Sequence, residues 1–389
     1  MEGRSGTDAK GDCIVEVRSK DGGGIAVETR NTELLERGLY AAIEETVERL
    51  GVRDVSVEVK DLGALDYVIA ARIETAVRAV RPETAPITPA VHRAPSERDR
   101  PRRSRLYAPG NNPRLLAGID IHGADCVLLD LEDSVPLGDK AAARILVKHL
   151  LAAVPFPEEA WVRINPLDAG GREDVAEVAR GRPHGICLPK AESARDVLDL
   201  DDELSRIEAE RGIEKGTVWI LPILETARGV LHAEEIAAAC DRVVMLAFGA
   251  EDFTRYVGAR RTSEGLLFAR SRIVAAASAA GVQASDTVYA DLSNTEGLVE
   301  EARLARDLGF DGKGAINPRQ IGPIHRAFSP TEEELESARA IVAAAREAEA
   351  QGLGAVALDG RMIDRPVLER ARRAMKYAEK LTKGGGRNA

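Results

Sequence analysis

The sequence predicts an α/β protein in which a closed (β/α)8 barrel of the TIM type, with a C-terminal lid, follows a small α+β domain. Eight apolar runs, each separated from the next by a stretch long enough for a helix, predict the barrel. A segment rich in proline and charge precedes them and marks a domain boundary. We therefore expect the small domain at 1–80, a linker at 81–102, the barrel at 103–330, and a C-terminal helix and lid at 331–389.

The small domain is expected to contain three strands and two helices. Two alternating runs flank Asp21-Gly22-Gly23, which is typical of a β-hairpin. Apolar residues at helical spacing then predict an amphipathic helix that starts at Asn31 or Thr32 and ends before Gly51. The expected elements are strands at 13–17, 24–29 and 55–59 and helices at 31–49 and 64–80.

The linker, RPETAPITPAVHRAPSERDRPRR (81–103), has no apolar periodicity and is rich in proline and charge. Proline restricts the backbone to extended conformations, so this composition predicts a semi-rigid spacer.

Apolar runs alternate with helical stretches after the linker. Continuous apolar runs are typical of parallel strands that are buried on both faces. An open, doubly wound sheet is the alternative, but no G-x-G-x-x-G follows the first run, which favours the closed barrel. The runs are SRLYAPG (104–110), DCVLLDLED (125–133), AWVRINP (160–166), GICLPKAE (185–192), TVWILPILET (217–226), RVVMLAFGAED (242–252), VQASDTVYAD (282–291) and GKGAINP (312–318).

Composition excludes several classes of protein. The net charge of −10 and the lack of a basic tract interleaved with aromatic residues argue against nucleic-acid binding. No apolar run reaches the roughly 18 residues that span a membrane, and no apolar leader is present, so we expect a cytoplasmic protein. The four cysteines are scattered, which gives no support to a zinc site or a disulfide framework.

Charged residues end most of the apolar runs. Barrel enzymes place their active sites at the carboxyl ends of the strands, so these residues are expected to converge on one mouth. The alternative is that strand ends are solvated and carry charge for that reason alone. The residues are Glu132, Asp133, Arg163, Lys190, Glu192, Glu225, Glu251, Asp252 and Asp291.

Glu225 and Asp252 end two neighbouring strands, with no histidine or cysteine nearby. Hard carboxylate oxygens favour Mg²⁺ or Mn²⁺ over zinc, and Mg²⁺ keeps waters that a substrate can replace. A salt bridge of this pair with Lys190 or Arg228 is the alternative.

Arg163 can donate two hydrogen bonds to a carboxylate or to an enolate-like oxygen. The alternative for Arg163 is a salt bridge with Glu132 or Glu192.

Eight motifs in order resemble the citrate lyase β-subunit branch of the HpcH/HpaI aldolase family, which includes malyl-CoA and citramalyl-CoA lyases. The resemblance covers about residues 103–380. It implies that Glu225 and Asp252 bind Mg²⁺, with Glu225 also at the substrate, and that Arg163 contacts the thioester carbonyl. It places Pro318 in the substrate site and Asp364 on a lid that closes over a neighbouring subunit as acid/base. The motifs are LYAPGNNPR (106–114), LLDLEDSV (128–135), VRINP (162–166), LPKAE (188–192), ILETARG (223–229), FGAEDF (248–253), INPRQI (316–321) and GRMIDRP (360–366).

The resemblance implies a Mg²⁺-dependent lyase that cleaves or forms the C–C bond of a 3-hydroxyacyl thioester. The thioester is of the citryl-CoA, citramalyl-CoA or malyl-CoA type, and the products are an α-keto acid such as oxaloacetate and an acetyl thioester. Glu132 is expected to act with Arg163 and Asp364 in catalysis by completing the polar wall. We also expect a homo-oligomer, a trimer or hexamer, and an α-type citrate lyase subunit as partner. The alternatives are a lyase of free acids and a non-catalytic or partner-dependent subunit.

The segment DLGALDYVIAARIETAVRAV (61–80) resembles the citrate lyase acyl carrier protein (γ subunit), over roughly residues 5–80. In that family a serine within G-T-x-x-S-G-D carries phosphoribosyl-dephospho-CoA. Here Lys10 stands at that position and cannot form the phosphodiester, and Ser5 is out of register. We therefore expect no covalent prosthetic group, and a lyase that acts on free CoA thioesters. The domain would then be a relic, a docking module or a structural appendage.

Overall fold

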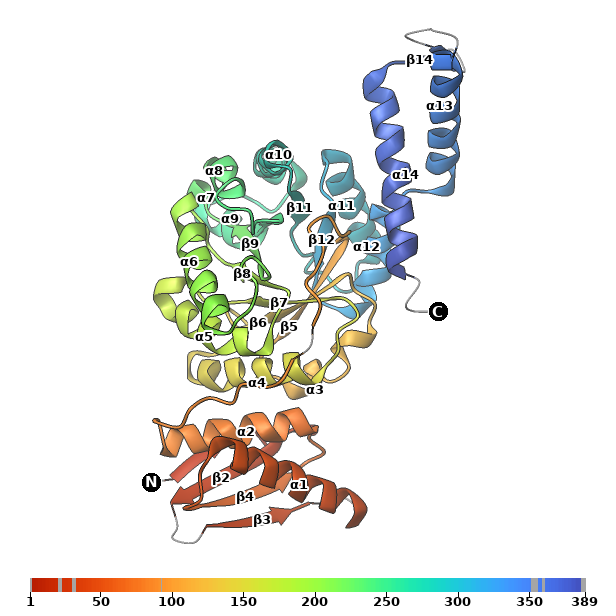
Figure 1. The fold of residues 1–389 in the computed structure, drawn as a ribbon. Helices are drawn as coiled ribbons and strands as arrows, with labels where there is room; N and C mark the ends of the chain where they lie inside the picture. Colours follow the sequence, from red (N-terminus) through yellow and green to blue (C-terminus); the bar gives the residue numbers. More distant parts are fainter. Residues whose placement is uncertain are drawn as a thin grey trace.

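The structure, a computed structural model, describes residues 2–19, 23–29, 33–91, 93–350, 356–358 and 361–385 (Figure 1). A small unit at the N-terminus packs beneath a barrel, and two long helices at the C-terminus project away from that barrel. None of the described helices is long and apolar enough to cross a bilayer.

The N-terminal unit is a four-stranded sheet in the order β1-β2-β4-β3, covered by two helices. Alternation buries one face of the central strands, where Val15 and Val17 of β2 join Val57 and Val59 of β4 against α2. The elements are β1 (Glu2–Ser5), β2 (Cys13–Ser19), β3 (Gly24–Glu28), α1 (Glu33–Leu50), β4 (Val55–Asp61) and α2 (Asp66–Val80).

The predicted hairpin between the first two alternating runs is wrong. β4 lies between β2 and β3, pairing antiparallel with β2 and parallel with β3. Helix α1 joins β3 to β4 and forms a crossover, which makes those two strands parallel. The exposed pattern of β3 suits an edge strand, while β4 has the buried alternation of a central one. Asp21, Gly22, Asn31 and Thr32 lie outside the described residues.

Residues 81–103 contain no helix or strand in the described part of the chain, but they are anchored to the barrel. The Arg93 guanidinium donates to four main-chain carbonyls of the barrel's outer layer, those of Leu151, Val154, Gly181 and Arg182. Arg102, fully buried, forms a bidentate ion pair with Glu159 at 2.7 and 2.8 Å. The segment is therefore held against the barrel at Arg93 and at Arg102.

Eight parallel strands close into a barrel, which confirms the predicted fold class. Each of the eight apolar runs contributes one strand. The strands are β5 (Ser104–Pro109), β6 (Cys126–Asp130), β7 (Glu159–Arg163), β8 (Gly185–Leu188), β9 (Trp219–Leu224), β10 (Met245–Phe248), β11 (Gln283–Asp286) and β12 (Gly312–Ala315). The helices around them are α3 (Pro113–Leu116), α4 (Lys140–Ala153), α5 (Arg172–Val178), α6 (Ala194–Glu210), α7 (Ala227–Leu231), α8 (Ala233–Ala237), α9 (Ala250–Val257), α10 (Ser263–Ala280), α11 (Thr295–Leu308) and α12 (Ile321–Phe328).

Apolar side chains fill the lower part of the barrel interior. Trp161, Leu128, Leu221 and Met245 belong to one buried cluster there. Gly185 faces the indole of Trp161, and a Cβ at this position would lie 2.3 Å from the ring, so only glycine fits. Because the lower interior is packed, the open space lies at the carboxyl ends of the strands.

A buried charge network joins the N-terminal unit to the barrel. Glu74 of α2 is fully buried and accepts from Lys148 at 2.6 Å and pairs with His149 at 2.7 Å, both on α4. Glu177 of α5 completes the pairing of Lys148 at 2.6 Å. Tyr67, also on α2, belongs to the barrel's own apolar core. The two units therefore share both polar and apolar contacts, and α2 lies along α4 in Figure 1.

Glu74→Gln is expected to destabilise the protein by about 3 kcal/mol, because it removes the buried carboxylate that pairs with His149 and leaves Lys148 with Glu177 alone. Burial opposes ionisation, but His149 and Lys148 lower the pKa of Glu74 from 4.5 to about 2. Because the pKa of Glu74 is lower in the folded protein than in the unfolded chain, its ionised carboxylate stabilises the fold above pH 4.5. This stabilisation is lost as the pH falls towards 2. Denaturant unfolding should show this loss in the wild type and not in the variant. A Glu45→Gln control, at an exposed position of α1, should match the wild type at every pH.

The C-terminal region forms a two-helix arm. Helices α13 (Glu332–Ala350) and α14 (Arg365–Gly385) pack through a small apolar cluster that includes Val342 and Ala371. Strands β13 (Val356–Leu358) and β14 (Arg361–Ile363) form an antiparallel pair at the far end of the arm (Figure 1).

Candidate functional site

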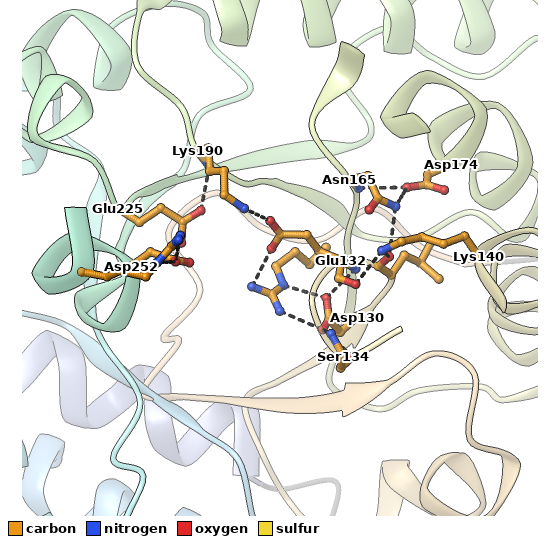
Figure 2. Close-up of polar contacts among 12 residues, drawn as sticks. Asp130, Glu132, Ser134, Lys140, Asn165, Asp174, Lys190, Glu225 and Asp252 are labelled. Carbon is orange, nitrogen blue, oxygen red and sulfur yellow. Dashed lines mark hydrogen bonds and ion pairs between the residues drawn. The ribbon is translucent and has the colours of Figure 1, made fainter. Parts of the chain in front are cut away.

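A cavity of about 460 Å³ opens at the carboxyl ends of the barrel strands. Several of the predicted site residues line it, and it takes side chains from several strands. Figure 2 shows two groups of carboxylates there, linked by Lys190. The lining includes Arg105, Tyr107, Asp130, Asp133, Ser134, Arg163, Glu225, Glu251, Asp252, Thr287 and Ile316.

Glu225 directly follows β9 and is 3% exposed, although it lines the cavity. Its Oε1 accepts the main-chain N–H of Lys190 at 2.8 Å, and no basic side chain pairs with it in the described chain. Burial, reinforced by the nearby Glu132 carboxylate, raises the pKa of Glu225 to about 8. A cation bound in the cavity would supply the positive charge that this buried carboxylate lacks.

Two backbone features position Glu225. Gly249 follows β10, and a Cβ on it would lie 2.6 Å from Glu225 Oε2, so a larger residue would displace the carboxylate. Lys190 has a φ of +50°, a left-handed conformation that non-glycine residues adopt only when surrounding contacts hold it. This conformation directs the Lys190 N–H to Glu225 while its ammonium contacts Glu132.

Asp252 lies in the first turn of α9 and lines the same cavity. Figure 2 draws its carboxylate near that of Glu225, and the two residues come after the paired strands β10 and β9. Asp252 Oδ1 accepts from Arg255 at 2.6 Å, on the solvent side. Within the described part of the chain, no cluster of three or more His, Cys, Asp or Glu side chains is positioned for a metal. Two carboxylates with open space beside them fit a hard, partly hydrated cation such as Mg²⁺ and do not fit a closed zinc site.

Arg163, the last residue of β7, is held by two carboxylates. Its Nε and Nη2 donate to Asp130 at 2.6 and 2.8 Å, and Nη1 pairs with Glu132 at 2.8 Å. Its guanidinium also lies 5.6 Å from the centroid of the Tyr107 ring. Burial opposes its charge, but the Asp130 and Glu132 carboxylates keep the pKa of Arg163 well above its ordinary value. The predicted salt bridge of Arg163 with Glu132 is therefore present, and Arg163 also lines the cavity.

Glu132 is 3% exposed and does not itself line the cavity. Its Oε1 accepts from the Lys190 ammonium, and its Oε2 forms an ion pair with Arg163. Glu132 therefore links Arg163 to Lys190, whose main-chain N–H binds Glu225. Through these contacts it acts as a positioning residue.

Sequence reasoning did not single out Asp130. It ends β6 in phase with Cys126 and Leu128, whose side chains point into the barrel. Its carboxylate orients Arg163 and also accepts from the Ser134 hydroxyl at 2.5 Å. The alternation of inward side chains along β6 indicates that Asp130 points into the barrel. The charged residues Glu132 and Asp133, which follow the strand directly, are the more obvious candidates in the sequence.

Two predicted residues lie apart from this group. Pro318 begins a short turn two residues after Ile316, which lines the cavity, but Pro318 does not line it. Asp364 is exposed at the start of α14, where its Oδ1 accepts the Val367 N–H at 3.1 Å. In Figure 1 the adjoining β14 lies away from the barrel of the same chain.

The expected place of Asp291 at the end of the seventh strand is wrong. β11 ends at Asp286, and Asp291 is exposed in the following loop, where it accepts from Ser293. Arg228, a predicted alternative partner of the carboxylate pair, instead lies 3.9 Å from Glu192 on the exposed rim.

Two known families match the chain. The HpcH/HpaI aldolase/citrate lyase family matches residues 103–318, and the malonate decarboxylase delta subunit (MdcD) family matches residues 2–80. Citrate lyase subunit beta of Haemophilus influenzae is 45% identical over 282 residues, covering 72% of this chain and 97% of the relative. The mitochondrial citramalyl-CoA lyase of Homo sapiens is 34% identical over 298 residues, covering 72% and 86%. These matches confirm the resemblances seen in the sequence.

Solved structures resemble the barrel. Protein CitE from Mycobacterium tuberculosis, in complex with magnesium, acetoacetate and coenzyme A, has a TM-score of 0.60 and 35% identity, covering 73% of this chain and 100% of that chain. A citrate lyase beta subunit from the same organism, complexed with oxaloacetate and magnesium, has a TM-score of 0.51 and 35% identity, covering 60% and 99%. The family match includes Arg163, Glu225 and Asp252, whereas Asp364 lies beyond it.

Proposed function

The chain belongs to the HpcH/HpaI aldolase/citrate lyase family of carbon–carbon lyases, and from this premise we propose that it cleaves or forms the C–C bond of a 3-hydroxyacyl-CoA thioester with Mg²⁺. The products of cleavage are a 2-oxo acid, such as oxaloacetate, and an acetyl thioester. The observation that carries the proposal is the pairing of Glu225 and Asp252 on one cavity with Arg163. Relatives named for citrate and citramalyl-CoA cleavage, and neighbours solved with magnesium and coenzyme A, support it.

Glu225 and Asp252 would hold the ion, with waters or substrate oxygens in its remaining positions. When bound, Mg²⁺ supplies Lewis-acid stabilisation of the substrate oxygen that becomes the keto group, worth several kcal/mol. Lys190 contributes indirectly, because its main-chain N–H fixes the Glu225 carboxylate at 2.8 Å.

Arg163 stabilises the thioester oxygen as negative charge develops on it. During cleavage the hydroxyl proton leaves to a base, the C–C bond breaks, and its electron pair moves onto the thioester as an enolate. Asp130 and Glu132 accept hydrogen bonds from three N–H groups of Arg163. One N–H on each of Nη1 and Nη2 therefore stays available to bind the substrate. Because both carboxylates hold the guanidinium before substrate arrives, little reorganisation is needed in the transition state.

Asp364 completes the reaction by delivering a proton to the enolate carbon. Asp364 is exposed directly after β14, which lies away from the barrel in Figure 1, and this fits a lid that serves the barrel of a neighbouring copy. We therefore propose a homo-oligomer, a trimer or hexamer, in which the arm of one chain supplies Asp364 to the next.

The N-terminal unit does not work as a covalent carrier in this proposal. Lys10 lies in the turn between β1 and β2, in a loop closed by the Thr7–Asp12 hydrogen bond at 2.8 Å. Arg72 in turn holds Asp12 through a buried bidentate ion pair. Ser5 is buried and cannot take the place of the missing serine. The substrates are therefore free CoA thioesters.

The purified chain alone, with Mg²⁺, is expected to release oxaloacetate and acetyl-CoA from citryl-CoA, or the corresponding 2-oxo acid from citramalyl-CoA or malyl-CoA. Coupling the released 2-oxo acid to an NADH-dependent dehydrogenase measures the rate. EDTA should stop the reaction, and excess Mg²⁺ should restore it. Cleavage of free citrate without CoA would favour a free-acid lyase, and inactivity on all three thioesters would favour a partner-dependent subunit.

A further inference from the structure

Arg105 carries a positive charge into the barrel interior. It is the second residue of β5 and is only 2% exposed. Among the described residues, no carboxylate lies within ion-pair distance of its guanidinium. Arg102 and Arg270, the other most deeply buried arginines, each have a bidentate carboxylate partner, Glu159 and Asp286. Arg105 therefore differs from them in lacking a counter-charge.

The contacts of Arg105 are also poor in acceptors. Nη1 donates to Met245 Sδ at 3.4 Å, and sulfur is a weak acceptor. Nε is buried with no hydrogen-bond partner in the described structure. An unpaired buried charge destabilises the folded protein, and proteins normally pair such groups. An anion that enters from outside would remove this cost.

Arg105 lines the same cavity as Arg163, Glu225 and Asp252, so an anion can reach it. It lies two residues before Tyr107 on β5, and a strand rises by about 3.3 Å per residue. The main chain of Arg105 is therefore about 7 Å further along β5, towards the closed end of the barrel, than that of Tyr107, whose ring packs against Arg163. We call the part of the cavity beside Arg105 its floor. A ligand held at Glu225 and Asp252 would need a further anionic group to bind Arg105 there.

We propose that Arg105 binds a carboxylate at the floor of the cavity, so that the 2-oxo acid half of the substrate is a dicarboxylate and not a monocarboxylate. This inference rests on the proposed function and narrows it to thioesters that release a 2-oxo diacid. A guanidinium forks onto a carboxylate through two N–H groups, which gives both charge and direction. Arg105 is in this role a specificity-determining residue that contacts substrate.

The test measures binding of racemic malate and racemic lactate by isothermal titration in the presence of Mg²⁺. The two acids share the 2-hydroxy acid group and differ mainly in the second carboxylate. The wild type should bind malate on the order of tenfold or more tightly than lactate. In Arg105→Met and Arg105→Gln this preference should vanish while lactate affinity stays unchanged, and Arg105→Lys should keep part of it.

Arg272→Met is the matched control, because it removes a positive charge from the outer helix α10 and should keep the full preference. Equal affinity of the wild type for both acids, or a preference that survives in Arg105→Met and Arg105→Gln, overturns the role of Arg105 and leaves the proposed function standing. If neither acid binds the wild type with Mg²⁺, the proposed function fails and this inference fails with it.

Discussion

Glu225→Gln is expected to abolish Mg²⁺ binding in the millimolar range and to lower kcat by about 10³-fold. The amide removes the buried negative charge that would hold the cation, and the Lewis-acid contribution of several kcal/mol disappears with it. Glutamine keeps the size of the side chain, and its oxygen can still accept the Lys190 N–H. The loss would therefore reflect charge and not shape. Titration calorimetry with Mg²⁺ and the coupled lyase assay measure both effects.

Glu192→Gln provides the control for Glu225→Gln, since this rim carboxylate is one-third exposed and lies outside the cavity lining. It should bind Mg²⁺ and turn over like the wild type. Wild-type Mg²⁺ affinity in Glu225→Gln would contradict the assignment of the cation site. Because the free carboxyl is buried, Glu225→Gln should also be at least as resistant to thermal unfolding as the metal-free wild type.

Asp364→Asn is expected to lower kcat by about 10²–10⁴-fold while leaving Mg²⁺ affinity unchanged, because the proton donor is lost and the cation site is untouched. The asparagine can still accept the Val367 N–H at the start of α14, so the arm should keep its fold. Normal turnover would remove Asp364 from the mechanism.

Mixing the two inactive variants tests whether the arm serves a neighbouring barrel. Hybrid oligomers of Glu225→Gln and Asp364→Asn contain some sites with an intact cation pair and an intact Asp364 from different chains. Co-purified hybrids should therefore regain a measurable part of the wild-type rate. No recovery, with hybrid formation verified by native mass spectrometry, would mean that each arm serves its own barrel.

The barrel, and the presence of Glu225 and Asp252 on one cavity, could be predicted because both depend on short-range patterns. Continuous apolar runs mark buried parallel strands, and residues that follow neighbouring strands meet at one end. The predicted hairpin is wrong because β4, a strand more distant in the sequence, lies between the two runs that form β2 and β3. Neither Asp21-Gly22-Gly23 nor the alternation of β3 indicates that β4 lies in the centre of the sheet.

The rest of the site depends on three-dimensional contacts that no spacing encodes. The main-chain N–H of Lys190 reaches Glu225 only because of a left-handed conformation at a residue that usually avoids it. Arg105 is the second residue of β5, and nothing in the sequence indicates that its guanidinium has no carboxylate partner among the described residues.

The buried cluster around Lys148 bears on how this protein can change over evolutionary time. Removing the first eighty residues would remove Glu74 and the apolar side chains of α2. It would also expose to solvent the buried side of α4, which carries apolar side chains and Lys148. Because Glu74 pairs with Lys148 and His149 of the barrel, the barrel depends on the N-terminal unit whether or not that unit carries a prosthetic group.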